Sequence, residues 1–359
     1  MKKLLSSVAL LGVAASIASP AIAADDSAVK LDLSGYARGY VSYVSQDDDG
    51  GEVADFDMLR DTEIHFTGET TLDSGLTIGA HIETAVDNGD NAATGDAIDE
   101  SYLYFSGNWG RVNMGEEDGA AYLLQVAAPS ADSNFDGVRQ YIQPLNDTAA
   151  GLVNSSFNID YANDEARDAD KVTYLSPVFN GFQLGASYTP ETTDGAASDI
   201  GGNRLTDSDL DDGYEAAVRY EGTLSNVGFA VGGGYTHINN EAAGADDFKE
   251  WNVGLDMNIA DFGVGAVYTE NNGAADDADS DTWVVGADYT VGAYKIGASY
   301  LNNEDDGAAS ETDRYAAGVT YSYAPGLSFR GSISHTQVDE DGVADVDGTA
   351  VLLGTQVNF

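Results

Sequence analysis

Carboxylates are the side chains with which this sequence could do chemistry, because 61 acidic residues stand against 15 basic ones. Closely spaced acids such as Asp61 and Glu63 could act as a general acid and base. On a solvated wall, however, such pairs are more often simply hydrated. No histidine has a partner motif beside it, and the four lie in separate segments as His65, His81, His237 and His335. The chain has no cysteine, which excludes thiol chemistry. We therefore expect no enzyme.

Two acidic runs, 207–212 and 275–281, could instead hold metal, since clustered carboxylates bind hard divalent cations. Neither run has the spaced ligand set of a calcium loop, so a solvated acidic rim is the simpler interpretation. We expect no cofactor, and Ca2+ or another divalent cation at these outer loops is a hypothesis. The net charge of -46 would repel nucleic acid.

The first 23 residues predict export. Met1, Lys2 and Lys3 form a positive start, an apolar run follows, and Ala21-Ile22-Ala23 is a small-residue cleavage site. The apolar run is too short for a membrane-spanning helix, so we expect a signal peptide over 1–23 and one folded domain over 24–359.

In the segments that must position these acids, apolar and polar residues alternate with a period of two. From Val29 onward, segments of about 9 to 13 residues place apolar side chains on one face and small or polar ones on the other, as in a tilted strand crossing an outer membrane. Leu31, Leu33, Val41 and Tyr43 share one face, and Arg38 falls on the opposite face. The same alternation recurs at 251–259, 283–289, 294–300 and 315–321.

Connections alternate in length too. Short turns such as Asp73-Ser74-Gly75 and Ala260-Asp261 separate long acidic loops, and aromatic residues gather near both ends of the strands. This layout predicts an antiparallel up-and-down transmembrane β-barrel of about sixteen strands with aromatic belts at two interfaces. A soluble extracellular calcium-binding β-sandwich is the alternative that alternation alone leaves open.

One connection is exceptional. After the short strand 111–116, roughly fifty residues pass before alternation resumes near Lys171, and structureless loops of this length are usually functional. The segment is too apolar for a free tail, with Tyr122, Leu123, Leu124 and Phe135. Folding it into the barrel lumen would bury these side chains and narrow a pore.

The mature chain resembles the general diffusion porins, particularly those of alphaproteobacteria. The resemblance rests on residues 33–39, on 64–68 followed by 76–80, on Asn113-Met114-Gly115 before the long loop, and on 351–359. It implies sixteen strands, a homotrimer, a third loop folded inward as a constriction, and recognition of Phe359 by the outer-membrane assembly machinery.

In the porins that this chain resembles, acids of the inward loop face bases on the wall. The loop residues available here are Glu116, Glu117, Asp118, Asp132 and Asp136. Strand parity places Arg38, Asp61, Glu63, His81 and Glu83 on the lumen wall, with further inward bases at Arg219, Lys295, Arg314 and Arg330. Where such relatives often carry several Arg or Lys, the first three strands keep only Arg38, which departs from the pattern.

These features predict an outer-membrane pore for passive diffusion of small hydrophilic solutes and ions. The acidic wall predicts a preference for cations. Tyr36 and Tyr40 on the lumen face leave a substrate-selective channel as the alternative. The expected partners are outer-membrane lipids and lipopolysaccharide, two further copies of the chain, and the assembly machinery.

Overall fold

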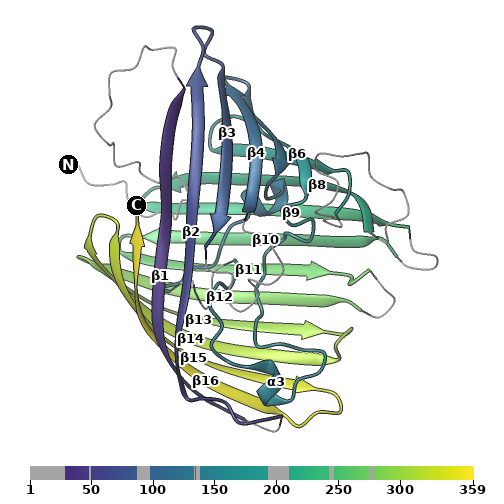
Figure 1. Ribbon diagram of the computed structural model, residues 1–359, viewed down its shortest axis with the longest axis vertical. Coiled ribbons are helices and arrows are strands. Elements are labelled where there is room, and N and C mark those ends of the chain that lie inside the picture. Colours follow the sequence, from purple (N-terminus) through teal and green to yellow (C-terminus); the bar gives the residue numbers. More distant parts are fainter. Residues whose placement is uncertain are drawn as a thin grey trace.

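The computed structural model describes residues 29–47, 50–86, 98–132, 134, 138–192, 210–241, 246–274 and 278–359. Sixteen strands form one closed antiparallel barrel, in which each strand pairs with its neighbours in sequence. Figure 1 shows the first strand beside the last, where β1 and β16 close the sheet. The predicted up-and-down barrel is confirmed, and the β-sandwich alternative is wrong.

The strands of the first half span Lys30–Gln46 (β1), Phe56–Thr71 (β2), Thr77–Ala85 (β3), Ile98–Gly107 (β4), Gly110–Glu116 (β5), Asp170–Leu175 (β6), Phe182–Thr189 (β7) and Leu210–Leu224 (β8). Those of the second half span Val227–Asn240 (β9), Phe248–Ile259 (β10), Phe262–Asn271 (β11), Ser280–Val291 (β12), Tyr294–Asp305 (β13), Ser310–Ala324 (β14), Leu327–Glu340 (β15) and Val346–Asn358 (β16).

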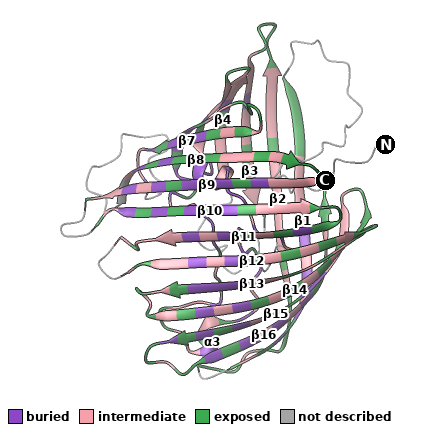
Figure 2. Ribbon diagram, turned by 180° about the vertical axis from the view of Figure 1, so that it is seen from behind, coloured by how far each residue is buried: buried purple, intermediate pink, exposed green. Residues whose placement is uncertain are grey.

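The two faces of the barrel differ as the alternation predicts. Outward residues such as Leu31, Leu33 and Trp251 are exposed, whereas Arg38 and Tyr40 on the inner face are buried. Figure 2 shows buried and exposed residues alternating along strands such as β9 and β10. An apolar exterior with a polar interior suits a barrel that meets lipid outside and water inside.

The seam between β1 and β16 is hydrogen-bonded beyond the strand ends. The backbone N–H of Phe359 donates to the Gly35 carbonyl at 3.0 Å, and the Gly35 N–H donates to the Phe359 carbonyl at 2.9 Å. The Phe359 ring is 48% exposed on the outer surface, as predicted.

The short turns lie where the sequence places them. Ser225 and Ala260 begin two-residue hairpin loops with φ of 60° and 55°, the left-handed conformation that tight hairpin turns require. The two described helices, α1 (Ala120–Leu123) and α3 (Asp147–Ala150), are single turns, and no described helix is long and apolar enough to cross a bilayer.

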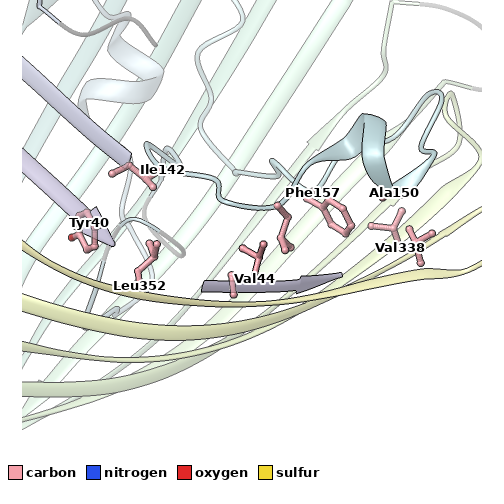
Figure 3. Close-up of a cluster of buried hydrophobic side chains, with 10 residues drawn as sticks. Tyr40, Val44, Ile142, Ala150, Phe157, Val338 and Leu352 are labelled. Carbon is pink, nitrogen blue, oxygen red and sulfur yellow. The ribbon is translucent and has the colours of Figure 1, made fainter. Parts of the chain in front are cut away.

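The long connection, residues 117–169 between β5 and β6, folds into the lumen. We call it the inward loop. Its Ile142 and Phe157 pack with Tyr40, Val44 and Leu352 of the barrel wall in a cluster of buried side chains (Figure 3). Burying a large apolar side chain stabilises a fold by about 1.5–3 kcal/mol. The apolar residues of this segment therefore hold it against the inner wall, which confirms the predicted inward fold.

Candidate functional site: the barrel interior

The inward loop lies closest to the wall where the wall carries glycine. A Cβ at Gly254 would stand 2.5 Å from the Val126 carbonyl oxygen, and one at Gly286 only 2.1 Å from the Pro129 carbonyl oxygen. Three pairs of glycines face one another on neighbouring strands between β9 and β14: Gly232 with Gly254, Gly265 with Gly286, and Gly297 with Gly318. Small residues make a track on which the loop backbone can lie flat.

Glu340 of β15 fixes the far part of the loop. Its carboxylate accepts hydrogen bonds from the backbone N–H groups of Val153, Asn154 and Ser155 at 3.2, 3.1 and 3.3 Å. It also accepts the Ser155 hydroxyl at 2.6 Å. Because Glu340 is only 2% exposed, these bonds satisfy a charge that has little access to water.

The acids of the inward loop do not face open water. Glu117, Asp118 and Asp132 are buried, and each has a partner. Glu117 accepts a hydrogen bond from the Asn113 amide, Asp118 pairs with Arg139 at 2.7 Å, and Asp132 accepts from the Ser332 hydroxyl at 3.2 Å. Burial also raises the pKa of Glu117 to about 7 and raises the pKa of Asp118. Their burial does not support the pore-facing role predicted for them, and assigns them to attachment of the loop.

Glu116 and Asp136 are the two other acids of this segment that are predicted to line the pore. Glu116 is the last residue of β5 and shares its parity with Met114, whose side chain is exposed on the outer face. The prediction that Glu116 lines the pore is therefore wrong, because one residue of parity exchanges the two faces of a strand. Asp136 lies outside the described residues, as do residues 1–23 and the parts 207–209 and 275–277 of the two acidic runs.

Arg38 lies on the inner wall, as predicted, and its charge is compensated by Asp61. Its Nε and Nη2 atoms both lie 2.6 Å from Asp61 Oδ2, and its Nη1 donates to the Asn134 side chain at 3.3 Å. The guanidinium also lies over two rings, 4.4 Å from the Tyr36 centroid and 4.1 Å from that of Tyr141. Loop and wall together thus cover the Arg38 guanidinium.

The other predicted bases also point inward and are paired. The pairs are Arg219 with Glu221 at 2.8 Å, Lys295 with Asp288 at 3.0 Å, Arg314 with Gln140 at 2.5 Å, and Arg330 with Asp132 at 3.9 Å. Arg314 is almost completely buried. Acidic partners compensate Arg219, Lys295 and Arg330, and burial keeps Arg314, whose partner Gln140 is neutral, away from a passing solute.

The wall formed by β2, β3 and β4 is different, and we call its inward side chains the open wall. In β2 and β3 together, the one buried residue is Gly79, so the loop does not cover these strands closely. The inward side chains here include Asp61, Glu63, His65, His81, Glu83, Glu100, Tyr102 and Tyr104. Register places Asp61, Glu63, His81 and Glu83 on the inner side of the barrel, and this is the face that water and solutes can reach.

His65 joins two predicted wall residues into one cluster. Its Nε2 lies 2.7 Å from Glu63 Oε1 and its Nδ1 lies 2.7 Å from Glu83 Oε1, while His81 Nε2 lies 2.6 Å from the same Glu83 oxygen. Sequence reasoning left His65 out because the histidines are far apart along the chain. The signal was available in the short turn at Ser74, which folds β3 back on β2 and pairs His65 with Glu83.

A pocket of about 250 Å³ lies between the loop and the long-loop ends of β10–β13. Its charged lining is acidic, with Asp160, Asp164, Glu165, Glu250 and Asp305. Burial raises the pKa of Asp160 to about 6. Above that pH the pocket adds negative charge beside the lumen.

An apolar outer surface, a polar interior and a loop folded into the lumen together define a membrane-spanning β-barrel. The chain belongs to the Gram-negative porin family, whose model matches residues 7–341. Among curated relatives it is similar to a monosaccharide porin of Halomonas, with 28% identity over 63% of each chain. An uncharacterized protein of Rickettsia bellii is 26% identical over 57% of this chain and 50% of its own length. The chain thus spans between half and about two thirds of these relatives.

Solved structures share the fold. A porin refined at 1.8 Å resolution superposes with a TM-score of 0.62 and 21% identity, over 92% of this chain and all of that chain. An anion-selective porin from Comamonas acidovorans gives 0.63 at 16% identity over the same shares. At such identities the likeness describes the barrel and not its selectivity.

Proposed function

We propose that this protein is an outer-membrane channel for passive diffusion of small hydrophilic solutes and ions, with a preference for cations and no enzymatic activity. The observation that carries the proposal is the unequal charge of the interior. The face that the loop leaves uncovered carries Asp61, Glu63, Glu83 and Glu100, and the neighbouring base Arg38 of β1 is buried and bound to Asp61. Acidic side chains along a pore concentrate cations and exclude anions.

The acidic pocket near the long-loop ends supports the same preference. Cations that enter between the loop and β10–β13 meet Asp164 and Glu250 before they reach the open wall. Family membership supports placement in the outer membrane and assembly as a homotrimer. Lipopolysaccharide and the assembly machinery are further partners in this proposal, with Phe359 as the residue that the machinery recognises.

Reconstitution into planar bilayers under a KCl gradient tests the proposal. We expect steady single-channel steps and a reversal potential displaced toward that of K+. A reversal potential on the Cl- side would contradict the cation preference, and absence of conductance by protein that shows the heat-modifiable gel shift of a folded barrel would contradict the channel itself. Crosslinking in detergent checks the trimer separately.

A sugar-selective channel is the second candidate, and aromatic residues of the open wall favour it. Tyr102 lies beside the His81 ring at 5.2 Å between centroids, and the Tyr104 hydroxyl donates to Glu69 at 2.7 Å. The Halomonas relative named a monosaccharide porin points the same way. Liposome swelling distinguishes the candidates: a general pore sorts sugars by size alone, whereas a selective channel admits one sugar faster than another of equal mass and loses that difference in Tyr102→Ala.

A further inference from the structure

The cluster on the open wall has the donor atoms of a transition-metal site. His65, His81 and Glu83 each offer one ligand atom, and these atoms lie within 4.8 Å of one another. Two imidazole nitrogens and one carboxylate oxygen form a ligand set that binds Zn2+ in proteins and leaves a fourth position for water. We propose that the open wall binds one Zn2+, or a similar borderline divalent ion, through His65 Nδ1, His81 Nε2 and Glu83.

On each imidazole, the nitrogen that would not bind the metal already lies beside an oxygen atom, and we call the residues that supply these oxygens the outer partners. His65 Nε2 lies 2.7 Å from Glu63 Oε1, and His81 Nδ1 lies 2.7 Å from the Thr67 hydroxyl. A histidine that binds metal through one nitrogen nearly always donates its other N–H to an oxygen, which fixes the ring and its tautomer. Glu63 and Thr67 supply those oxygens, and leave His65 Nδ1 and His81 Nε2 directed at Glu83.

Strand register makes this convergence a property of the barrel. The β2–β3 pairing sets the ligands His65 and Glu83 opposite each other, and it sets the ligand His81 opposite Thr67, which orients it. The donors come from two paired strands and not from a loop. Such a site needs no folding event on binding, because the sheet already holds its backbone.

The metal replaces protons in this geometry. Both Glu83 contacts, at 2.7 and 2.6 Å, are hydrogen-bond distances in which a proton lies between nitrogen and oxygen. Zinc bonds of about 2.0–2.1 Å separate ligand atoms by roughly 3.3 Å, so the side chains open by several tenths of an ångström as the ion displaces those protons. None of these side chains is fully buried, which leaves them room to rotate.

The acidic surface of the protein sets the design of the test, because carboxylates elsewhere bind divalent ions weakly. Equilibrium dialysis of the detergent-folded full chain against ZnCl2 therefore includes an excess of Ca2+, which occupies oxygen-only sites and competes poorly for imidazole. We expect one Zn2+ per chain to remain. X-ray absorption at the zinc edge should show two histidines among the ligands.

Variants of matched chemistry complete the test. His65→Gln with His81→Gln should abolish the retained Zn2+, and Glu63→Gln, an outer partner, should weaken binding by about 10–100-fold. The control is His335→Gln, because His335 lies on β15 and contacts Thr349. All variants must show the heat-modifiable gel shift before dialysis, and Thr67→Val gives a second outer-partner change if Glu63→Gln fails to fold.

Retention of Zn2+ by the double histidine variant, or loss of it in His335→Gln, would overturn the site. So would complete displacement of Zn2+ by Ca2+ in the wild type. The site does not depend on the ion preference of the pore, since binding is measured without conductance and the KCl reversal potential is measured without zinc.

Discussion

The two halves of the inner wall carry different residues because different things approach them. From β9 to β14 the wall meets the backbone of the inward loop, and glycine pairs such as Gly265 with Gly286 stand where a side chain would collide with it. On β2 and β3 the wall meets water, and the inward positions carry Glu63, His65 and Glu83. Small residues thus let the loop backbone approach the wall, and the charged side chains of the uncovered face stay within reach of water.

The largest effect is expected when a methyl group is added to the wall that the loop covers. Gly286→Ala places a Cβ 2.1 Å from the Pro129 carbonyl, so the loop must move or the strand must bend. Overpacking of this kind costs about 1–3 kcal/mol. We expect a lower urea midpoint for the barrel in detergent and a changed single-channel conductance.

Gly39→Ala is the matched control, since a Cβ at Gly39 has nothing within 4 Å. It should leave both the urea midpoint and the conductance as in the wild type. Equal effects of the two substitutions would show that the glycine track is not what seats the loop.

A smaller effect is expected from releasing the far part of the loop. Glu340→Ala removes the acceptor of the N–H groups of Val153, Asn154 and Ser155 and leaves these donors without it. Val153 and Asn154 are exposed, so water can replace the carboxylate there, and each lost hydrogen bond costs about 0.5–1.5 kcal/mol. Limited proteolysis of the folded barrel should cut near 153–155 faster than in wild type. Asp339→Ala, on the exposed face of the same strand, should not change the rate of cutting.

The smallest expected effect is a dependence of selectivity on pH. The raised pKa values of Glu117, about 7, and Asp160, about 6, mean that both acids are neutral below these values and anionic above them. Cation preference should therefore rise as the pH increases from 5.5 to 8. Reversal potentials of the Glu117→Gln, Asp160→Asn double variant should rise less.

Other ionisable groups are the same in the variant and in the wild type. The informative quantity is thus the difference between the variant and the wild type. Identical pH profiles for the two proteins would contradict a contribution from the buried acids.

Periodicity predicted most of the barrel because one rule of parity assigns every strand residue to a face. It placed Arg38, Asp61 and Glu83 on the inner wall without knowledge of any contact. The inward loop follows no such rule. Whether Glu117 or Asp132 faces water depends on which wall residue meets it across the lumen, and this long-range packing has no local signal.

The histidine cluster is harder to predict from the sequence than a strand face and easier than the path of the inward loop. It needs parity together with register, and the turn at Ser74 supplies the register that pairs His65 with Glu83. Counting both ways from that turn would have found it. Glu116 shows the opposite risk, because grouping it with the loop acids overlooks that it is the last residue of β5, on the same face as Met114.

The central claim, that the open wall sets ion preference, is tested most directly by two double variants with the same chemical change. Glu63→Gln with Glu83→Gln removes charge from the open wall. Glu117→Gln with Glu215→Gln makes the same substitution at two buried carboxyl groups, one in the inward loop and one on β8, where Glu215 accepts a hydrogen bond from the Ala121 N–H. Under a KCl gradient at pH 7, the open-wall variant should lose most of the displacement toward K+, and the buried variant should keep most of it. An equal or larger loss in the buried variant would contradict the account.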